Sequence, residues 1–219
     1  MAVKVYFVRH GQTYLNLYNR IQGWSDAPLT KKGLEDAKRA AQVLKPIKFD
    51  AAFSSDSSRA VITARTILAA NPSSLTEPIT DPDFREEFFG YFEGADGAHT
   101  WDFLGRPLGL NTISEMIAGL SMEKVRDMIH DADPYGTAED NVTFWQRLDR
   151  GFERLRQQPD ETNVLVASHG TVLRSIISRF APEMDSSASP KNGSITRLSL
   201  TPTDTKVDFF NQLTLPSNI

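Results

Sequence analysis

Short apolar runs alternate with amphipathic segments along most of this chain. Runs of strand length, rich in β-branched and aromatic residues, occupy residues 3–8, 50–55 and 163–168. Apolar residues at the three- and four-residue spacing of a helix occupy about 31–45, 56–70, 139–157 and 170–180. Two late apolar runs, 194–200 and 206–213, are expected to be edge strands. The alternation predicts an α/β fold, a three-layer sandwich with helices on both faces of a mostly parallel central sheet.

The helix predicted after residue 30 shows the pattern most clearly. Thr30 is a typical N-cap residue. The apolar stripe that follows begins at Leu34 and includes Ala37 and Leu44. Proline cannot continue a helix, so we expect this helix to end before Pro46.

The pattern loosens between about 72 and 140, where prolines and glycines interrupt it. Apolar clusters at 101–110 and 113–120 still have helix-like spacing. We therefore expect a single domain over residues 1–219, with a mainly helical cap inserted at about 95–135. A chain of this length can bury a full core without disulfides or metals.

Composition excludes several classes of protein. The net charge of −4 gives no overall attraction for nucleic acid. The chain has no cysteine, which excludes disulfides, thiolate metal sites and a cysteine nucleophile. It has no run of eighteen apolar residues, and its amino terminus lacks the pattern of a signal peptide. We therefore expect a cytoplasmic protein that binds neither nucleic acid nor membranes.

Two of the strand runs end in the same way. VYFVRHG places His10, and VLVASHG places His169, directly after an apolar strand and before a glycine. The chain has only four histidines, so two ordinary buried histidines are a poor explanation for this repeated setting. The carboxyl ends of neighbouring parallel strands meet at one edge of the sheet, where open α/β folds place their active sites. We therefore expect the two imidazoles to lie close together.

Arginines accompany the two histidines. Arg9 precedes His10, and Arg59 lies one helical turn beyond a third strand end. Guanidinium groups match phosphate oxygens in geometry, and the amides that begin helix 170–180 add further donors. This combination predicts a phosphate-binding pocket.

The residues of such a pocket suit phosphoryl transfer without a metal. A neutral imidazole can attack phosphorus and form a phosphohistidine, which water then hydrolyses. The arginines and the second histidine would stabilise charge on the transferring group. A leaving alkoxide also needs a proton, and the stretch FREEFFGYFEG offers Glu86, Glu87 and Glu93 as candidate acids. Spacing alone does not choose among these three.

Together these motifs resemble the histidine phosphatase superfamily, which contains cofactor-dependent phosphoglycerate mutase and its phosphatase relatives. The matching motifs cover nearly the whole chain: RHGQTYLN (9–16), QGWSDAPLTKKG (22–33), SSDSSRAVITA (54–64), REEFFGYFEG (85–94), GTAED (136–140), SHGTVLR (168–174) and NGSI (192–195). The RHG triplet alone is a weak signal, whereas all of these motifs in this order are highly specific.

The resemblance implies roles for the matching residues. His10 would be the nucleophile, and Arg9, Arg59 and His169 would complete the phosphate pocket. Glu86 stands four residues before the glycine of the family's E-x-x-x-G stretch, which makes it the implied general acid.

The resemblance also implies further contacts to the phosphate. They would come from Asn16, from Gln22 or the backbone at Gly23, and from the amide of Gly170. Glu87 and Glu93 become neighbours of the acid, with Glu93 in a structural role. Asp56 and Glu139 are expected to support the arginine and the loop rather than to take part in the chemistry.

The family performs both mutase and phosphatase reactions. Its mutases carry E-R-H-Y-G around the acid and a downstream arginine pair, whereas this chain has E-E-F-F-G and, between Gly94 and Gly136, only Arg106 and Arg126. We therefore expect a phosphatase of the histidine acid type, a metal-independent phosphomonoester hydrolase with no cofactor. Its substrate would be a small phosphorylated metabolite or other phosphoester, and it would be a monomer or homodimer. Mutase-type phosphoryl transfer and a catalytically inactive phosphate-binding regulatory module are the alternatives.

The cap sequence leaves the substrate open. Its apolar residues, among them Trp101 and Ile113, are expected mostly to pack the cap itself, and the alternative is that a few line a pocket for a bulky ester. His99 and His130 are expected at the surface, although His99 would reach a substrate if the cap folds over the site.

Overall fold

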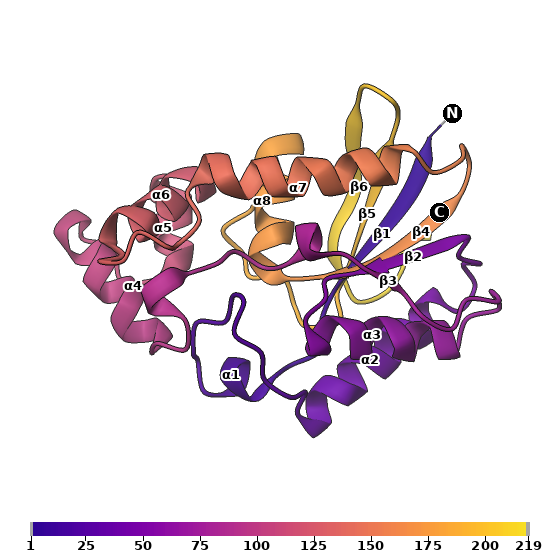
Figure 1. Ribbon diagram of the computed structural model, residues 1–219, viewed down its shortest axis with the longest axis horizontal. Helices are drawn as coiled ribbons and strands as arrows, with labels where there is room; N and C mark the ends of the chain where they lie inside the picture. The colour runs from indigo at the N-terminus through magenta and orange to yellow at the C-terminus, as the bar shows by residue number, and fades with distance from the viewer. Residues whose placement is uncertain (1, 218–219) are drawn as a thin grey trace.

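The computed structural model describes residues 2–217. The strands are β1 (Val3–Arg9), β2 (Ala51–Ser54), β3 (Ile79–Thr80), β4 (Asn163–Ser168), β5 (Ile195–Leu200) and β6 (Thr205–Gln212). The α-helices are α1 (Tyr14–Leu17), α2 (Lys31–Leu44), α3 (Ser58–Ala69), α4 (Gly97–Gly105), α5 (Ile113–Gly119), α6 (Met122–Ala132), α7 (Asn141–Arg156) and α8 (Gly170–Phe180). Short 3₁₀ helices are η1 (Pro82–Phe84), η2 (Gly90–Phe92) and η3 (Arg106–Leu108). Strands and helices alternate as predicted (Figure 1).

The strands form one mixed sheet in the order β3-β2-β4-β1-β5-β6. The first four of these are parallel to one another, whereas β5 and β6 pair antiparallel. The prediction of a mostly parallel sheet is therefore confirmed. The prediction that both late strands are edges is wrong for β5, because β6 pairs with its outer side. The opposite edge is β3, whose two residues are too few to show any periodicity in the sequence.

The pairing of β1 with β4 brings the two His-Gly strand ends together. The parallel register places Val5 beside Val164 and Arg9 beside Ser168. His10, the first residue after β1, donates its backbone N–H to the carbonyl of Ser168 at 3.0 Å. Strands β1 and β4 therefore end at the same level, at the carboxyl edge of the sheet.

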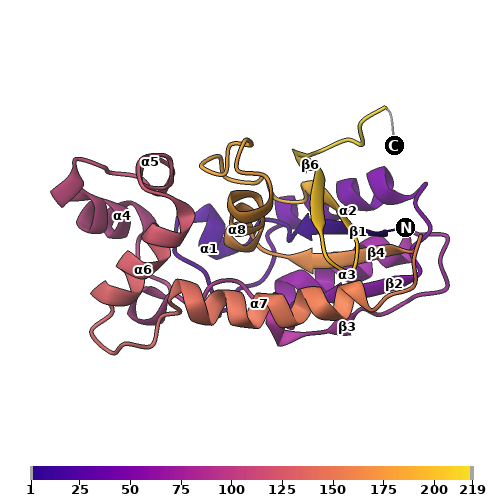
Figure 2. The same ribbon diagram turned by 90° about the horizontal axis from the view of Figure 1, so that it is seen from above.

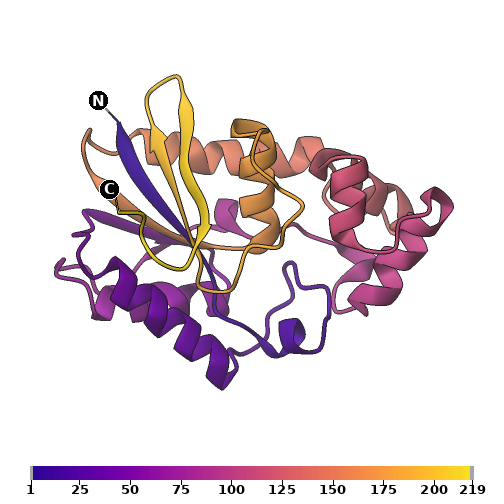
Figure 3. The ribbon, with the colours of Figure 1, turned by 180° about the vertical axis from the view of Figure 1, so that it is seen from behind.

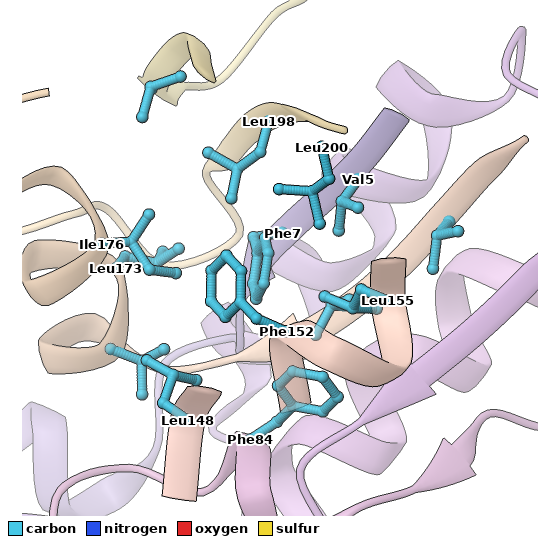
Figure 4. Close-up of a cluster of buried hydrophobic side chains, with 14 of the residues drawn as sticks. Val5, Phe7, Phe84, Leu148, Phe152, Leu155, Leu173, Ile176, Leu198 and Leu200 are labelled. Atoms are coloured by element: carbon cyan, nitrogen blue, oxygen red, sulfur yellow. The ribbon is translucent and has the colours of Figure 1, made fainter. Parts of the chain in front are cut away.

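Helices cover both faces of the sheet because alternate residues of a strand face opposite sides. On β1, Val5 and Phe7 belong to the core beneath α7 and α8 (Figure 4). Tyr6 and Val8 belong to the core on the other face, beneath α2 and α3. Figure 3 shows α2 and α3 on one side of the sheet and α7 and α8 on the other. The three-layer sandwich is confirmed.

Helix α2 begins at its predicted cap. The side chain of Thr30 accepts a hydrogen bond from the N–H of Gly33 at 3.0 Å. Ala37 is buried as expected, but Leu34 is 43% exposed, so its place in the buried stripe is corrected. The reason is that Gly33 faces inward: a Cβ there would lie 2.0 Å from the carbonyl oxygen of Gln12, and its neighbour Leu34 is turned toward solvent.

Helices α4, α5 and α6 gather beyond one end of the sheet (Figures 1 and 2). They enclose a third apolar core that includes Leu104, Met116 and Ile129. Most apolar residues of the cap therefore pack the cap itself. Helix α7 runs from this group along the sheet, so the cap is joined to the sheet layer by a continuous helix (Figure 2).

Among residues 2–217, no helix is both long enough and apolar enough to cross a membrane.

Candidate functional site

The two histidines lie together at the carboxyl edge of the sheet. His10 follows β1, and His169 is the N-cap residue of α8 directly after β4. Their ring centroids are 5.2 Å apart, and the side chains are 3% and 0% exposed. The expected convergence of the two imidazoles is present in the structure.

The hydrogen bond of His10 determines which ring nitrogen is reactive. Nδ1 lies 2.8 Å from the carbonyl oxygen of Gly11. A carbonyl oxygen only accepts, so Nδ1 carries the proton and Nε2 keeps its lone pair. Burial, together with Arg59 and Arg9, holds the pKa of His10 well below its ordinary value. The ring is therefore neutral near pH 7, the state that a nitrogen nucleophile requires.

His169 has the opposite tautomer. Its Nδ1 lies 3.2 Å from Nη2 of Arg59, and a guanidinium only donates, so Nδ1 accepts. Burial and the nearby Arg59 hold the pKa of His169 well below its ordinary value, so the ring is neutral and its proton resides on Nε2. His169 thus offers an N–H donor beside the lone pair of His10.

Two backbone carbonyls and one carboxylate hold the guanidinium of Arg59. Nη2 also donates to the carbonyl of Gly23 at 2.7 Å. Nη1 donates to the carbonyl of Ser25 at 3.0 Å and to Asp26 at 3.1 Å. These bonds and the one to His169 occupy the four N–H groups of the guanidinium tips, which leaves the Nε–H as the remaining donor.

Arg9 is positioned by the NGSI motif. The N–H of Gly193 donates to the carbonyl of Arg9 at 2.9 Å, and the side chain of Asn192 donates to the carbonyl of His10 at 2.9 Å. The guanidinium of Arg9 donates through Nη1 to the carbonyl of Pro190. The motif therefore holds the end of β1 in place, and Pro190, two residues before the motif, anchors the guanidinium of Arg9.

Buried nitrogen atoms without a hydrogen-bond partner concentrate at this edge. Among residues 2–217 they are Arg9 Nε, Gln22 Nε2, Arg59 Nε, His169 Nε2 and, away from the histidines, Arg39 Nε. Native structures rarely leave buried donors unpaired, because each costs the desolvation of a polar group. Arg59 contacts His169, whose ring centroid lies 5.2 Å from that of His10. Gln22 lines a cavity together with Arg9. Unpartnered donors gathered in this part of the structure, near an imidazole lone pair, suit a compact anion with several acceptor oxygens, and a phosphoryl group fits that description.

Glu86 lies against the start of α8. Its carboxyl group accepts hydrogen bonds from the N–H groups of Thr171 at 2.9 Å, Val172 at 3.1 Å and Glu87 at 3.0 Å. Burial raises the pKa of Glu86, and the bonds from these N–H groups oppose that rise. The helix start was expected to bind phosphate; the structure assigns two of its amides to Glu86 instead and leaves the N–H of Gly170 without an acceptor among the described residues.

The two other candidate acids are held elsewhere. Glu87 is fully buried and pairs with Nε of Arg126 at 3.0 Å. Glu93 accepts hydrogen bonds from the N–H groups of Gly23, Trp24 and Ser25 at 2.9–3.1 Å, and so fastens the 22–25 loop. Of the three, only Glu86 lines the cavity that Arg9 and Gln22 also line.

The remaining predicted contacts divide between the site and the loops. Asn16 and Gln22 line the cavity with Arg9, and they are linked to each other at 3.5 Å. The N–H of Gly23 is bonded to Glu93, so at this place the structure leaves the Gln22 side chain as the donor.

The two expected supporting carboxylates each pair with an arginine. Asp56 forms a two-pronged pair with Arg85 at 2.7 and 2.5 Å, whereas Arg59 is supported by Asp26. Glu139 binds Arg147 at 2.7 Å and accepts from the N–H of Phe88 at 3.0 Å. Both groups therefore stabilise the segments around the site.

The comparison with known families decides which group of proteins this site belongs to. The sequence model described as "Histidine phosphatase superfamily (branch 1)" matches residues 5–213. The chain belongs to the histidine phosphatase superfamily. This superfamily consists of phosphatases and mutases that act on small phosphorylated metabolites.

Relatives carry both kinds of name. The chain is 31% identical over 178 residues to the 2,3-bisphosphoglycerate-dependent phosphoglycerate mutase 2 of Gloeobacter violaceus, covering 81% of this chain and 74% of that protein. A crystal structure of phosphoglycerate mutase from Bacillus anthracis is 32% identical, with a TM-score of 0.89 over 97% of this chain and 94% of that one. A putative alpha-ribazole-5'-P phosphatase from Escherichia coli shares the fold, with 22% identity and a TM-score of 0.71 over 99% of both chains.

In this chain the unpartnered donors of Arg9, Gln22 and Arg59 adjoin two cavities. The first, of about 150 Å³, is lined by Arg9, Asn16, Gln22, Glu86 and Gly170 and by cap residues. The second, of about 260 Å³, is lined by Arg59, Arg85, Asp56 and the serines at 55 and 57. Glu86 borders both cavities.

The cap contributes part of the wall of the first cavity. Trp101 and Ile113 line it together with Phe89, so a few apolar cap residues face the cavity while most pack the cap core, as expected. The alternative of a pocket that selects a bulky ester stays a prediction. His99 is exposed and lies outside this cavity. His130 is partly buried and its Nδ1 lies 2.7 Å from the carbonyl of Ala138, which corrects its placement at the surface.

Arg174 lines the cavity but is not among the predicted site residues. It belongs to the SHGTVLR motif and stands four residues after Gly170 on α8, one helical turn further along the same face. That spacing is a signal in the sequence that would have identified it. No group of three or more histidine, aspartate or glutamate side chains within residues 2–217 is arranged to hold a metal ion.

Proposed function

We propose that this protein is a metal-independent phosphomonoester hydrolase that works through a phosphohistidine at His10. The observation that carries the proposal is the neutral His10, which keeps a lone pair on Nε2 beside the ring of His169, together with four buried N–H donors, on Arg9, Gln22, Arg59 and His169, that have no partner. A phosphate ester satisfies those donors and presents its phosphorus to the lone pair.

In the first step Nε2 of His10 attacks phosphorus and the bond from phosphorus to the ester oxygen breaks. Arg9, Arg59 and His169 donate to the oxygens of the transferring group and stabilise its charge. Glu86, with its raised pKa, gives its proton to the leaving oxygen, so an alcohol departs.

In the second step water attacks phosphorus and the bond from phosphorus to Nε2 breaks. The Glu86 carboxylate left by the first step takes the proton of the attacking water. The products are inorganic phosphate, His10 with its lone pair restored and Glu86 with its proton. Because Glu86 borders both cavities, it is accessible from the side of the leaving group and from the second cavity.

The arginines of the cap support hydrolysis over mutase-type transfer. Arg106 is 75% exposed and paired with Asp102, and Arg126 is fully buried against Glu87. Neither lines the cavity, so the cap supplies no arginine pair for a substrate carboxylate. Mutase-type transfer is the second candidate, because the relatives above 30% identity are named phosphoglycerate mutases.

Release of p-nitrophenolate from p-nitrophenyl phosphate, measured with a chelator present, tests the proposal. Wild type and His99→Ala are expected to turn over equally, since His99 lies outside the cavity. His10→Ala is expected to lose activity on the order of 10⁴-fold, the scale of removing a nucleophile. If wild type releases p-nitrophenolate no faster than His10→Ala, the protein is a phosphate-binding module without turnover. If the chelator abolishes activity, the metal-free mechanism is refuted.

The acid is tested with leaving groups of different basicity. Glu86→Gln is expected to slow an alkyl phosphate far more than p-nitrophenyl phosphate, because p-nitrophenolate departs with little need of a proton. Glu87→Gln is the matched control. If Glu87→Gln shows this pattern and Glu86→Gln does not, the acid is Glu87.

Hydrolysis and mutase transfer are separated by product analysis. Incubation with 3-phosphoglycerate, with and without 2,3-bisphosphoglycerate, is expected to release inorganic phosphate and glycerate. Formation of 2-phosphoglycerate faster than phosphate release would establish the mutase instead.

A further inference from the structure

The catalytic cavity has more positive charge than a phosphoryl group compensates. Arg9, Arg20 and Arg174 line it, and Glu86 is its only acidic residue among those described. A phosphoryl group carries up to two negative charges, fewer than the three arginines that line the cavity, and its arginine contacts are assigned to the unpartnered Nε–H groups of Arg9 and Arg59. Arg174 and the exposed Arg20 are left over, and Arg174 is the buried one of the two, with its Nη2 3.5 Å from the hydroxyl of Ser114 in the cap.

Arg174 is a buried cation without an acidic partner. It is 4% exposed, and no carboxylate among residues 2–217 lies within 4.0 Å of its guanidinium. Burial and the positive charge of Arg9 lower the pKa of Arg174 to about 10. A buried arginine is normally paired with an acid, because an unpaired charge in a protein interior is costly.

The hydrogen bonds of Arg174 leave one side of its guanidinium free. Nη2 donates to the carbonyl of Ser187 at 2.9 Å, and Nε to the carbonyl of Ala188 at 3.4 Å. A longer contact joins Nη2 to the hydroxyl of Ser114 at 3.5 Å. Within the described chain Nη1 has no acceptor, so two N–H groups remain for a ligand in the cavity that Arg174 lines.

We propose that Arg174 binds a second anionic group of the substrate, which makes the substrate class a phosphate ester with a carboxylate or a second phosphate. This proposal rests on the proposed function, because the first anion is the phosphoryl group at His10. Trp101 and Ile113, which line the same cavity from the cap, contact the carbon skeleton between the two anions.

The size of the cavity limits the substrate. Arg174 lines the same cavity as Arg9 and Glu86, and the volume of this cavity is about 150 Å³. Such a volume fits a short carbon chain between the phosphate and the second anion, so a compact acid phosphate is favoured over a large ester. The carboxylate or second phosphate of the substrate would accept hydrogen bonds from Nη1 of Arg174. The carbonyls of Ser187 and Ala188 keep the other edge of the guanidinium in place.

Three esters with the same carbon chain test this proposal. Glycerol 3-phosphate has no second anion, 3-phosphoglycerate has a carboxylate, and glycerol 1,3-bisphosphate has a second phosphate. Phosphate release gives kcat/KM for each, and the preference is the ratio of either bis-anion to glycerol 3-phosphate. We expect a preference above about 10 in wild type and a loss of at least 10-fold in that preference, mainly through KM, in Arg174→Gln. The better of the two bis-anions identifies the second group.

Two further variants separate recognition from structure. Arg65→Gln, an exposed arginine paired with Glu77, is expected to keep the wild-type preference. Arg174→Lys keeps the charge and is expected to keep part of the preference even if Arg174→Gln folds poorly. Equal losses for all three esters in both Arg174 variants, or a wild-type preference near 1, would overturn the proposal and leave Arg174 as a tether of the 187–188 loop.

A binding experiment keeps this test independent of turnover. In the His10→Ala background, 3-phosphoglycerate is expected to raise the melting temperature more than glycerol 3-phosphate at equal concentration, and Arg174→Gln is expected to abolish the difference. If p-nitrophenyl phosphate is not hydrolysed by wild type, the proposed function fails while this comparison still decides the role of Arg174. If p-nitrophenyl phosphate is hydrolysed and no difference in binding is found, only the second-anion site is refuted.

Discussion

Two pairs of arginines lie near the segment of Glu86 and Glu87: Arg9 with Arg59, and Arg126 with Arg147. The two pairs differ in how their hydrogen-bond donors are used. Arg9 and Arg59, at the carboxyl edge of the sheet, each keep a buried Nε–H without a partner. Arg126 and Arg147, at the base of the cap, donate from every guanidinium nitrogen.

The pair in which every guanidinium nitrogen has a partner holds the segment that contains Glu86 and Glu87. Arg147 donates to the backbone carbonyls of Asp83, Arg85 and Glu86 at 2.9–3.2 Å while paired with Glu139. Arg126 lies over the ring of Phe144 and joins α6 to α7, to α8 and to the segment of Glu87.

The difference shows that burial and charge alone do not mark a ligand site. An arginine whose three guanidinium nitrogens all have partners stabilises the fold, whereas an arginine with a buried nitrogen that lacks any partner is available to a ligand. Substitutions in the two pairs should therefore affect different measurements.

The largest effect is expected for Arg59→Lys. A lysine keeps the charge but loses the Nε–H and the rigid geometry of the guanidinium, so kcat should fall roughly 10²–10³-fold. The melting temperature should fall less than it does for Arg126→Met. Activity within threefold of wild type would place Arg59 with the structural arginines.

Arg126→Met is expected to affect stability instead. Removing one partner of a fully buried ion pair should cost about 3 kcal/mol or more, which for a chain of this size is about 10 °C in melting temperature. Measured well below that temperature, kcat of the folded variant should stay within a few-fold of wild type. A large loss of kcat with little change in stability would contradict the contrast between the two pairs.

Glu87 should make the stability depend on pH. Burial raises the pKa of Glu87 from 4.5 to about 7, despite the opposing charge of Arg126. The stability from its protonated form is fully present below pH 4.5 and is lost as pH rises toward and through 7, because the unfolded chain ionises more readily. Glu87→Gln is expected to remove this slope from urea unfolding measured between pH 5 and 8. An unchanged slope would mean that Glu87 stays ionised beside Arg126.

The smallest effect is expected for Asp56→Asn. Its pair with Arg85 has excellent geometry, but both side chains are about one-third exposed, at 31% and 33%. Partly solvated pairs contribute about 1 kcal/mol or less. The hydrogen bonds from Arg85 lower the pKa of Asp56, so its contribution disappears as pH falls through that lowered value. A loss as large as that of Arg126→Met would show that exposure is a poor guide here.

Local sequence patterns predicted most of the elements that form the site. The strands 3–8 and 163–168, the cap residue Thr30 and the buried stripe of α7 follow from periodicity and turn chemistry, which act over a few residues. The two His-Gly ends needed one further rule, that parallel neighbours end at the same edge. Periodicity failed at Leu34 because the inward position is taken by a glycine that packs against the backbone of residue 12.

The choice among the three glutamates needed contacts between distant parts of the chain. Glu86 meets the amides of Thr171 and Val172, 85 and 86 residues later, whereas Glu87 meets Arg126 and Glu93 meets the 23–25 loop. Adjacent residues on an irregular segment point in different directions, so spacing does not reveal which carboxyl group faces the cavity.

The amino-acid order thus establishes the fold class, the paired histidines and the family, because these rest on short patterns and on motifs that recur in a set order. The tautomers of His10 and His169, the donors left for a phosphate and the cation at Arg174 depend on which groups meet after folding. Hydrogen bonding is directional and short in range, so which donors remain free is settled only when distant segments are packed together.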